Sequence, residues 1–255
     1  MPPAATLARL VLLEARRGGL PWLAAGCIAL GIGLGAFLSQ VALTESRELQ
    51  LALVAAWLRA CAVFLIAAHV ATRTVREIDD KALELMLALP LARTTHYLGR
   101  LAGLAACGAL LATVFALPLL LWAAPGAVAA WAVSLAFELA LVAATALFFA
   151  MTLVQPVPAI AATAGLYLLG RSITALQVLA GGGPLADASV FGQLARGSVA
   201  AVAFLLPRLD EATRTEWLLY GAPPATAYGA VLGGLLLYIV ILAAAGLFDF
   251  ERKNV

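Results

Sequence analysis

Six long apolar runs dominate the 255-residue chain, and each is long enough to cross a lipid bilayer as a helix. About twenty apolar residues cross the hydrocarbon core, where a helix satisfies its own backbone hydrogen bonds. Only 12% of the residues are charged, whereas soluble domains are about one-quarter charged. The chain is therefore predicted to be an all-α integral membrane protein with a single domain, 1–255. The predicted spans cover residues 21–43, 49–71, 97–122, 127–154, 159–180 and 225–248.

Two segments outside the spans are predicted to contain shorter helices. Thr6 to Arg17 is amphipathic and basic, which favours a helix lying along the membrane interface. The long connection 181–224 is predicted to lie on the outer side of the membrane, with a partly re-entrant or interfacial helix over Val199 to Leu206. We expect a second short helix in this connection, beginning at Asp210.

The distribution of basic residues predicts which side of the membrane each connection occupies. Six spans place both termini on one side. Ten lysines and arginines lie in the N-terminal segment, in 73–96 together with Arg100, and in the C-terminal tail. The opposite side has four, which are Arg47, Arg196, Arg208 and Arg214. Because basic residues are enriched in cytoplasmic loops, both termini and residues 73–96 are predicted to be cytoplasmic.

Residues 73–96 form the one long polar interruption in the apolar N-terminal half. Asp79 and Asp80 stand where the N-terminus of a helix would be capped, and an apolar helix over Lys81 to Leu89 is predicted to follow. Such a helix is about 13 Å long, too short to cross a bilayer. Its apolar side therefore has to be covered by another protein or by the membrane surface. The residues at i, i+3, i+4 and i+7 on that side are Leu83, Met86, Leu87 and Pro90.

This segment resembles a known one. The residues that carry the resemblance are Arg76-Glu77, Asp80-Lys81, Leu83 to Leu87, Leu89-Pro90, Arg93 and Tyr97 to Arg100. In this spacing they are similar to the segment after the second span of ABC transporter permeases of the type-2 exporter family. In that family the segment is a coupling helix, which docks into a groove of a separate ATPase subunit.

The resemblance implies a function and a set of partners. It implies that the chain is the membrane subunit of an ATP-driven exporter in a bacterial inner (plasma) membrane. The subunit would work as a dimer with a second copy of itself, and its partners would be ATPase subunits and membrane lipid. It also implies an N-terminal elbow helix over Thr6 to Arg17 and paired external helices between spans five and six. The residues assigned to ATPase coupling are Arg76, Glu77, Asp79, Asp80, Lys81, Leu83, Glu84, Met86, Leu87, Pro90 and Arg93.

The chain has no nucleotide-binding motif of its own. Lys81 and Lys253 are the only lysines, and neither follows the glycine pattern of a P-loop. No cofactor is therefore expected in this chain, and ATP and Mg²⁺ would be bound by the partner. A net charge of +2 gives no indication of nucleic-acid binding. No catalytic or metal-binding motif is evident, but a membrane-embedded lipid-modifying enzyme and a structural anchor subunit are the alternative interpretations.

Three charged residues lie within predicted spans, near the middle of the bilayer. They are Arg59, Glu138 and Arg171. A charge at that depth costs several kcal/mol unless it is paired or hydrated. It therefore indicates either a structural ion pair or a functional site. One carboxylate cannot neutralise two guanidinium groups, so we expect Glu138 to pair with one arginine and the other to face a hydrated path between protomers.

Overall fold

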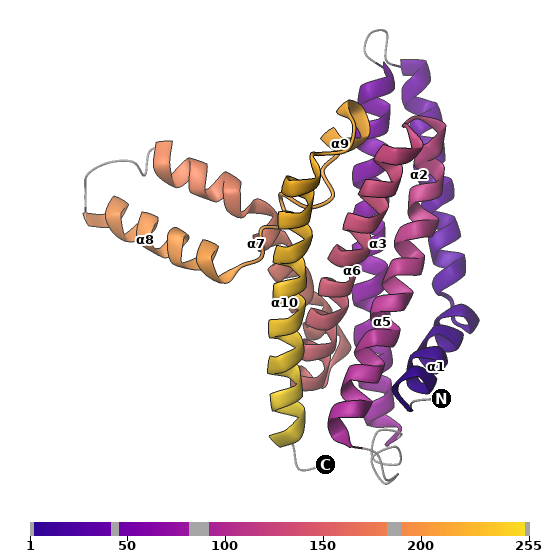
Figure 1. Cartoon of the computed structure of the whole chain (residues 1–255), viewed down its shortest axis with the longest axis vertical. Helices are drawn as coiled ribbons and strands as arrows, with labels where there is room; N and C mark the ends of the chain where they lie inside the picture. The colour runs from indigo at the N-terminus through magenta and orange to yellow at the C-terminus, as the bar shows by residue number, and fades with distance from the viewer. Residues whose placement is uncertain (1–2, 42–45, 82–91, 183–189, 253–255) are drawn as a thin grey trace.

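The computed structural model describes residues 3–41, 46–81, 92–182 and 190–252, and all regular structure in these ranges is helical (Figure 1). Within these ranges six helices are long and apolar enough to cross a membrane, as many as the predicted spans. They are α2 (Leu20–Val41), α3 (Ser46–Asp79), α5 (Arg93–Ala116) with a 3-10 extension η1 (Leu117–Leu121), α6 (Pro125–Leu153), α7 (Pro156–Gly182) and α10 (Ala225–Arg252). The shorter helices are α1 (Pro3–Arg17), α8 (Val190–Leu205) and α9 (Glu216–Tyr220).

Helix α6 forms the centre of the bundle. It packs against α3, α5, α7 and α10. Large side chains along its length, including Trp131, Leu135, Leu139 and Leu147, have no exposed surface. A helix that is apolar on every side is stable when it is surrounded by other helices. By contrast, α2 and α10 bury little of their surface inside the protein and present apolar side chains outward, as helices facing lipid do.

Helix α1 is separate from α2 and lies across α5. It ends just before Gly18 and Gly19, and α2 then leaves in a different direction (Figure 1). The contact with α5 requires Gly103, because a Cβ atom there would lie 2.9 Å from the Cα of Ala8. The predicted N-terminal helix is therefore present and is packed on the bundle through a close backbone approach.

The second span is longer than predicted. We expected it to end at residue 71, but α3 continues to Asp79, because Thr74 and Val75 are buried against neighbouring helices. The chain then leaves the helix at Lys81, which has a left-handed φ of 54°. Lys81 therefore cannot be the first residue of a right-handed helix, as we had predicted. The remainder of the predicted coupling helix, with Leu83, Glu84, Met86, Leu87 and Pro90, lies outside the described residues.

The connection between α7 and α10 differs most from the prediction. The end of α7 and α8 project sideways from the bundle as a hairpin (Figure 1). Helix α8 begins well before Val199, and the next helix begins at Glu216 rather than at Asp210. Between them the chain turns into the bundle, where Leu209 is 1% exposed and Ala212 and Thr213 are fully buried. The entry of this part of 181–224 into the bundle was not predicted from the sequence.

The predicted sidedness can be tested by cysteine labelling. Helix α1 begins and α10 ends at the same end of the bundle (Figure 1). We expect a cysteine at the exposed Glu216 to react with a membrane-impermeant maleimide in intact cells. A cysteine at the exposed Glu251 should react only after the cells are permeabilised. Labelling of position 251 in intact cells would contradict a cytoplasmic C-terminus.

Candidate functional site

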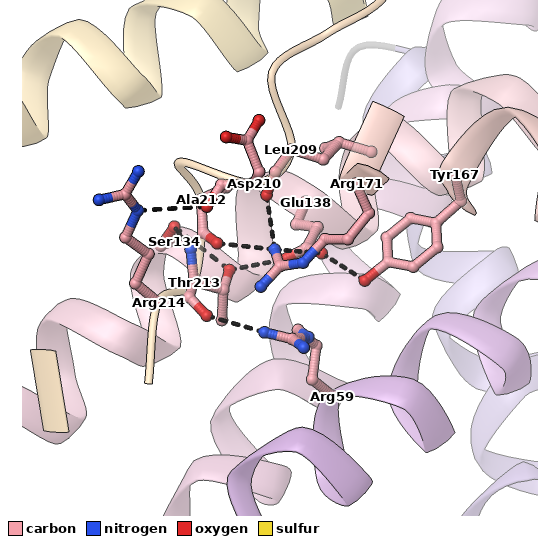
Figure 2. A network of polar contacts seen from close by, with 10 residues as sticks. All are labelled: Arg59, Ser134, Glu138, Tyr167, Arg171, Leu209, Asp210, Ala212, Thr213 and Arg214. Atoms are coloured by element: carbon pink, nitrogen blue, oxygen red, sulfur yellow. Dashed lines mark hydrogen bonds and ion pairs between the residues drawn. The ribbon is translucent and has the colours of Figure 1, made fainter. Parts of the chain in front are cut away.

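The three mid-span charges meet in one buried network, together with the segment that enters the bundle between α8 and α9 (Figure 2). Glu138 lies near the middle of α6 and has no exposed surface. Its Oε1 accepts a hydrogen bond of 2.8 Å from the Tyr167 hydroxyl and lies 3.8 Å from Arg171 Nη1. Its Oε2 accepts a hydrogen bond from the Thr213 hydroxyl. We call these residues, with Arg59, Ser134 and the chain from Leu209 to Thr213, the midplane network.

Arg171 is the arginine that pairs with Glu138. Its Nη1 also donates hydrogen bonds to the backbone carbonyls of Leu209 at 2.5 Å and Ala212 at 2.8 Å. The side chain is 21% exposed, so it is largely removed from solvent. An intramembrane guanidinium group is stabilised by an acid or by backbone carbonyls. Arg171 has both kinds of partner.

Arg59 has a different partner. Its Nη1 donates a hydrogen bond of 3.1 Å to the backbone carbonyl of Thr213. Among the described residues, no acid lies within 4.0 Å of its guanidinium group. Among the described residues Glu138 therefore lies within ion-pair distance of Arg171 and not of Arg59, and a hydrated path between protomers beside Arg59 stays a prediction. The second arginine, however, binds a carbonyl of the entering segment.

Thr213 connects Glu138, through its hydroxyl, with Arg59, through its backbone carbonyl. Its φ of 48° lies in the left-handed region, which is unfavourable for a β-branched residue. It is fully buried, and its N–H donates a hydrogen bond of 3.0 Å to the Ser134 hydroxyl. Strained residues of this kind persist where the surroundings hold them, and they cluster at functional sites. Ser134 and Glu138 are four apart on α6, so one helix face holds Thr213 at two points.

The sequence analysis missed one acid near this network. Asp210 lies on the entering segment and interacts electrostatically with Arg171, although its carboxylate points away from the guanidinium group (Figure 2). Its Oδ2 accepts a hydrogen bond of 2.7 Å from Thr174, and its backbone carbonyl accepts one from Arg214. The sequence signal that could have helped is the cluster of acids and bases at 208–216.

A second polar cluster joins the two helices that flank residues 82–91. Arg100 on α5 is 5% exposed, and its Nη1 lies 2.6 Å from Glu77 Oε2 on α3. Its Nη2 donates a hydrogen bond of 2.9 Å to the Thr74 hydroxyl. Glu77 was predicted to act in ATPase coupling, and in the structure its carboxylate forms an ion pair with Arg100 of the same chain. We call Thr74, Glu77 and Arg100 the α3–α5 clamp.

The other predicted coupling residues within the described ranges lie on either side of this clamp. Arg76, Asp79, Asp80 and Lys81 are exposed at the end of α3. Arg93 is the first residue of α5 and is partly buried. Apart from Glu77, these charged side chains therefore border the undescribed segment and remain at or near the surface.

The end of α10 packs against the start of α5, next to the clamp. Phe250 is 3% exposed and contacts the rings of His96 and Tyr97, at centroid distances of 6.3 Å and 6.1 Å. Gly246 allows this packing, because a Cβ atom there would clash with the Tyr97 ring. The last span is therefore connected to the helix that follows the predicted coupling segment.

The described residues contain no candidate metal site, since no group of three or more His, Cys, Asp or Glu side chains within them could hold an ion.

Comparison with known proteins does not assign the chain to a family. No protein-family model matches it, and no curated protein matches it.

The hydroxyl of Thr213 provides a direct test of the midplane network. We expect Thr213→Val to lower the free energy of unfolding by about 1–3 kcal/mol, because valine keeps the shape but leaves the buried Glu138 without one donor. Thr213→Ser should stay close to the parent protein, since it retains the hydroxyl. Thermal unfolding in detergent, followed by circular dichroism, measures both variants. Equal stability of the valine and serine variants would show that this hydrogen bond is not important.

Proposed function

We propose that this chain is the membrane-spanning permease subunit of an ATP-driven exporter of the ABC type-2 kind. Two copies would form the translocation path, and separate ATPase subunits would bind ATP and Mg²⁺ and dock on residues 73–96 of each copy. The observation that carries the proposal is the α3–α5 clamp beside the segment that resembles a coupling helix. A docking segment can transmit force only if its two ends are attached to rigid elements.

The clamp meets this mechanical requirement. Arg100 is buried and contacts both Glu77 and Thr74, so the last turns of α3 and the first turns of α5, which flank residues 82–91 in the sequence, are joined to each other. A movement imposed on that segment would act on both helices together. Phe250 extends the connection to α10 through its contacts with His96 and Tyr97.

The midplane network would respond to that movement. Arg59 on α3 and Arg171 on α7 both bind carbonyls of the Leu209–Thr213 segment. A shift of α3 relative to α7 would break some of these hydrogen bonds and release the segment from the bundle. ATP binding can drive such a change only if the rearranged state interacts better with the closed ATPase dimer.

Purification of the intact complex tests the proposal. We expect the tagged full chain, extracted gently from its native membrane, to co-purify with an ABC-type ATPase that is identified by mass spectrometry. The complex should hydrolyse ATP, and a Walker-motif substitution in the ATPase should abolish that activity while leaving the complex assembled. If the chain purifies in quantity and folded, but never with an ATPase, the permease assignment is wrong.

A further inference from the structure

A lateral groove of about 540 Å³ lies between α1, α2 and α5. Its walls are apolar side chains from all three helices, including Leu12, Ile28 and Leu110. Arg16 is the one charged residue among the described residues that line it. We call this the elbow groove. Its volume falls within the range of about 300–1,000 Å³ that is usual for small-molecule sites.

The groove results from the way in which the chain changes direction after α1. Gly103 brings α1 into close contact with α5, with its missing Cβ only 2.9 Å from Ala8 Cα. After the break at Gly18 and Gly19, α2 leaves α5 and packs mainly against α3. A gap therefore remains where α2 and α5 diverge. Leu13 and Leu110, which are 50% and 60% exposed, line the gap and face outward from the protein.

One end of the groove is positively charged. Arg16 is in the last turn of α1 and lines the groove, whereas its neighbour Arg17 does not. The Arg73 guanidinium lies 3.3 Å from where a Cβ of Gly18 would be. Two acids, Glu14 and Glu77, lie nearby, and Glu77 is already paired with Arg100. Arg16 has no ion-pair partner among the described residues. The groove thus combines apolar walls with a basic end.

We propose that the elbow groove binds an acyl chain of an anionic phospholipid, with the lipid phosphate next to Arg16. Apolar walls favour a hydrocarbon chain, and basic sites at the cytoplasmic ends of membrane helices attract anionic headgroups. A zwitterionic lipid such as phosphatidylcholine places a choline cation beside its phosphate and so has no net negative charge to offset Arg16, and inorganic phosphate would leave the apolar walls uncovered. The proposal concerns a part of the chain distant from the midplane network and does not depend on the proposed transport function.

Native mass spectrometry of the purified full chain tests the headgroup contact. The protein is exchanged into detergent micelles that contain phosphatidylglycerol or phosphatidylcholine with the same acyl chains, and the retained lipids are counted. We expect one phosphatidylglycerol to be retained in preference to phosphatidylcholine. Arg16→Gln should lower this retention about fivefold, the effect of one basic contact to an anionic lipid surface. Arg17→Gln is the matched control, because Arg17 does not line the groove.

A second pair of variants tests the acyl-chain contact. Ala25 lines the groove from an exposed position on α2, and Ala29 lies one turn further along without lining it. We expect Ala25→Trp to block retention of the lipid and Ala29→Trp to leave it unchanged. Equal losses for the two arginine variants, or equal retention by the two tryptophan variants, would overturn the proposal. Circular dichroism and elution volume verify that all four variants are folded.

Discussion

Removing the Glu138 carboxylate or the Arg171 guanidinium alone is expected to destabilise the protein strongly. Glu138 is fully buried and Arg171 is mostly buried, so either single change leaves the other charge without its ionic partner. Breaking a buried pair in this way costs about 3–5 kcal/mol. For a chain of this length that corresponds to a fall of about 10 °C in the apparent Tm. Glu138→Gln and Arg171→Gln should each show it in thermal unfolding of the detergent-solubilised protein.

The double variant Glu138→Gln/Arg171→Gln distinguishes pairing from simple loss of hydrogen bonds. We expect its destabilisation to be smaller than the sum of the two single effects by about 1–3 kcal/mol, because neither charge then remains unpaired. The control is the exposed pair Arg208 and Glu211, whose nitrogen and oxygen lie 3.5 Å apart. Replacing both by glutamine should change stability by less than about 1 kcal/mol. Additive effects of the Glu138 and Arg171 substitutions would show that the two charges do not stabilise each other.

Leu87→Asp is expected to abolish coupling to the ATPase proposed above. Leu87 belongs to the apolar side of the helix that the sequence predicts after Lys81, together with Leu83 and Met86. A carboxylate at this position would be buried in the docking groove without a partner. The protein should still insert in the membrane, but ATPase binding and transport-linked ATP hydrolysis should be lost. Co-purification of the ATPase and the rate of ATP hydrolysis measure the effect.

Leu85→Asp is the matched control for this substitution. On a helix with 3.6 residues per turn, position 85 lies on the side opposite to Leu87. We therefore expect Leu85→Asp to retain most of the ATPase binding. If Leu87→Asp keeps normal ATPase binding and hydrolysis, residues 73–96 do not form the docking segment. If both variants lose binding, the segment tolerates no added negative charge, and the assigned apolar side is wrong.

The span pattern was predictable from the sequence because it depends on a local property. A run of apolar residues long enough to cross the bilayer can be recognised without knowledge of its neighbours. All six runs are helices in the structure, and a separate helix precedes the first. The end of α3 was not predicted correctly, since apolarity ends near residue 71 but the helix continues to Asp79. Its continuation depends on the burial of Thr74 and the contact of Glu77 with Arg100, which are tertiary interactions.

The midplane network shows more clearly which features the sequence predicts and which only the tertiary structure decides. The sequence identified Arg59, Glu138 and Arg171, because a charge within an apolar run is conspicuous and needs compensation. It did not identify the partners, since the carbonyls of Leu209, Ala212 and Thr213 carry no side-chain signal and lie in a connection between predicted spans. The sequence by itself determined that charges in the spans had to be compensated. The tertiary structure alone decided how, because a backbone carbonyl becomes a partner only where the fold brings it within hydrogen-bonding distance.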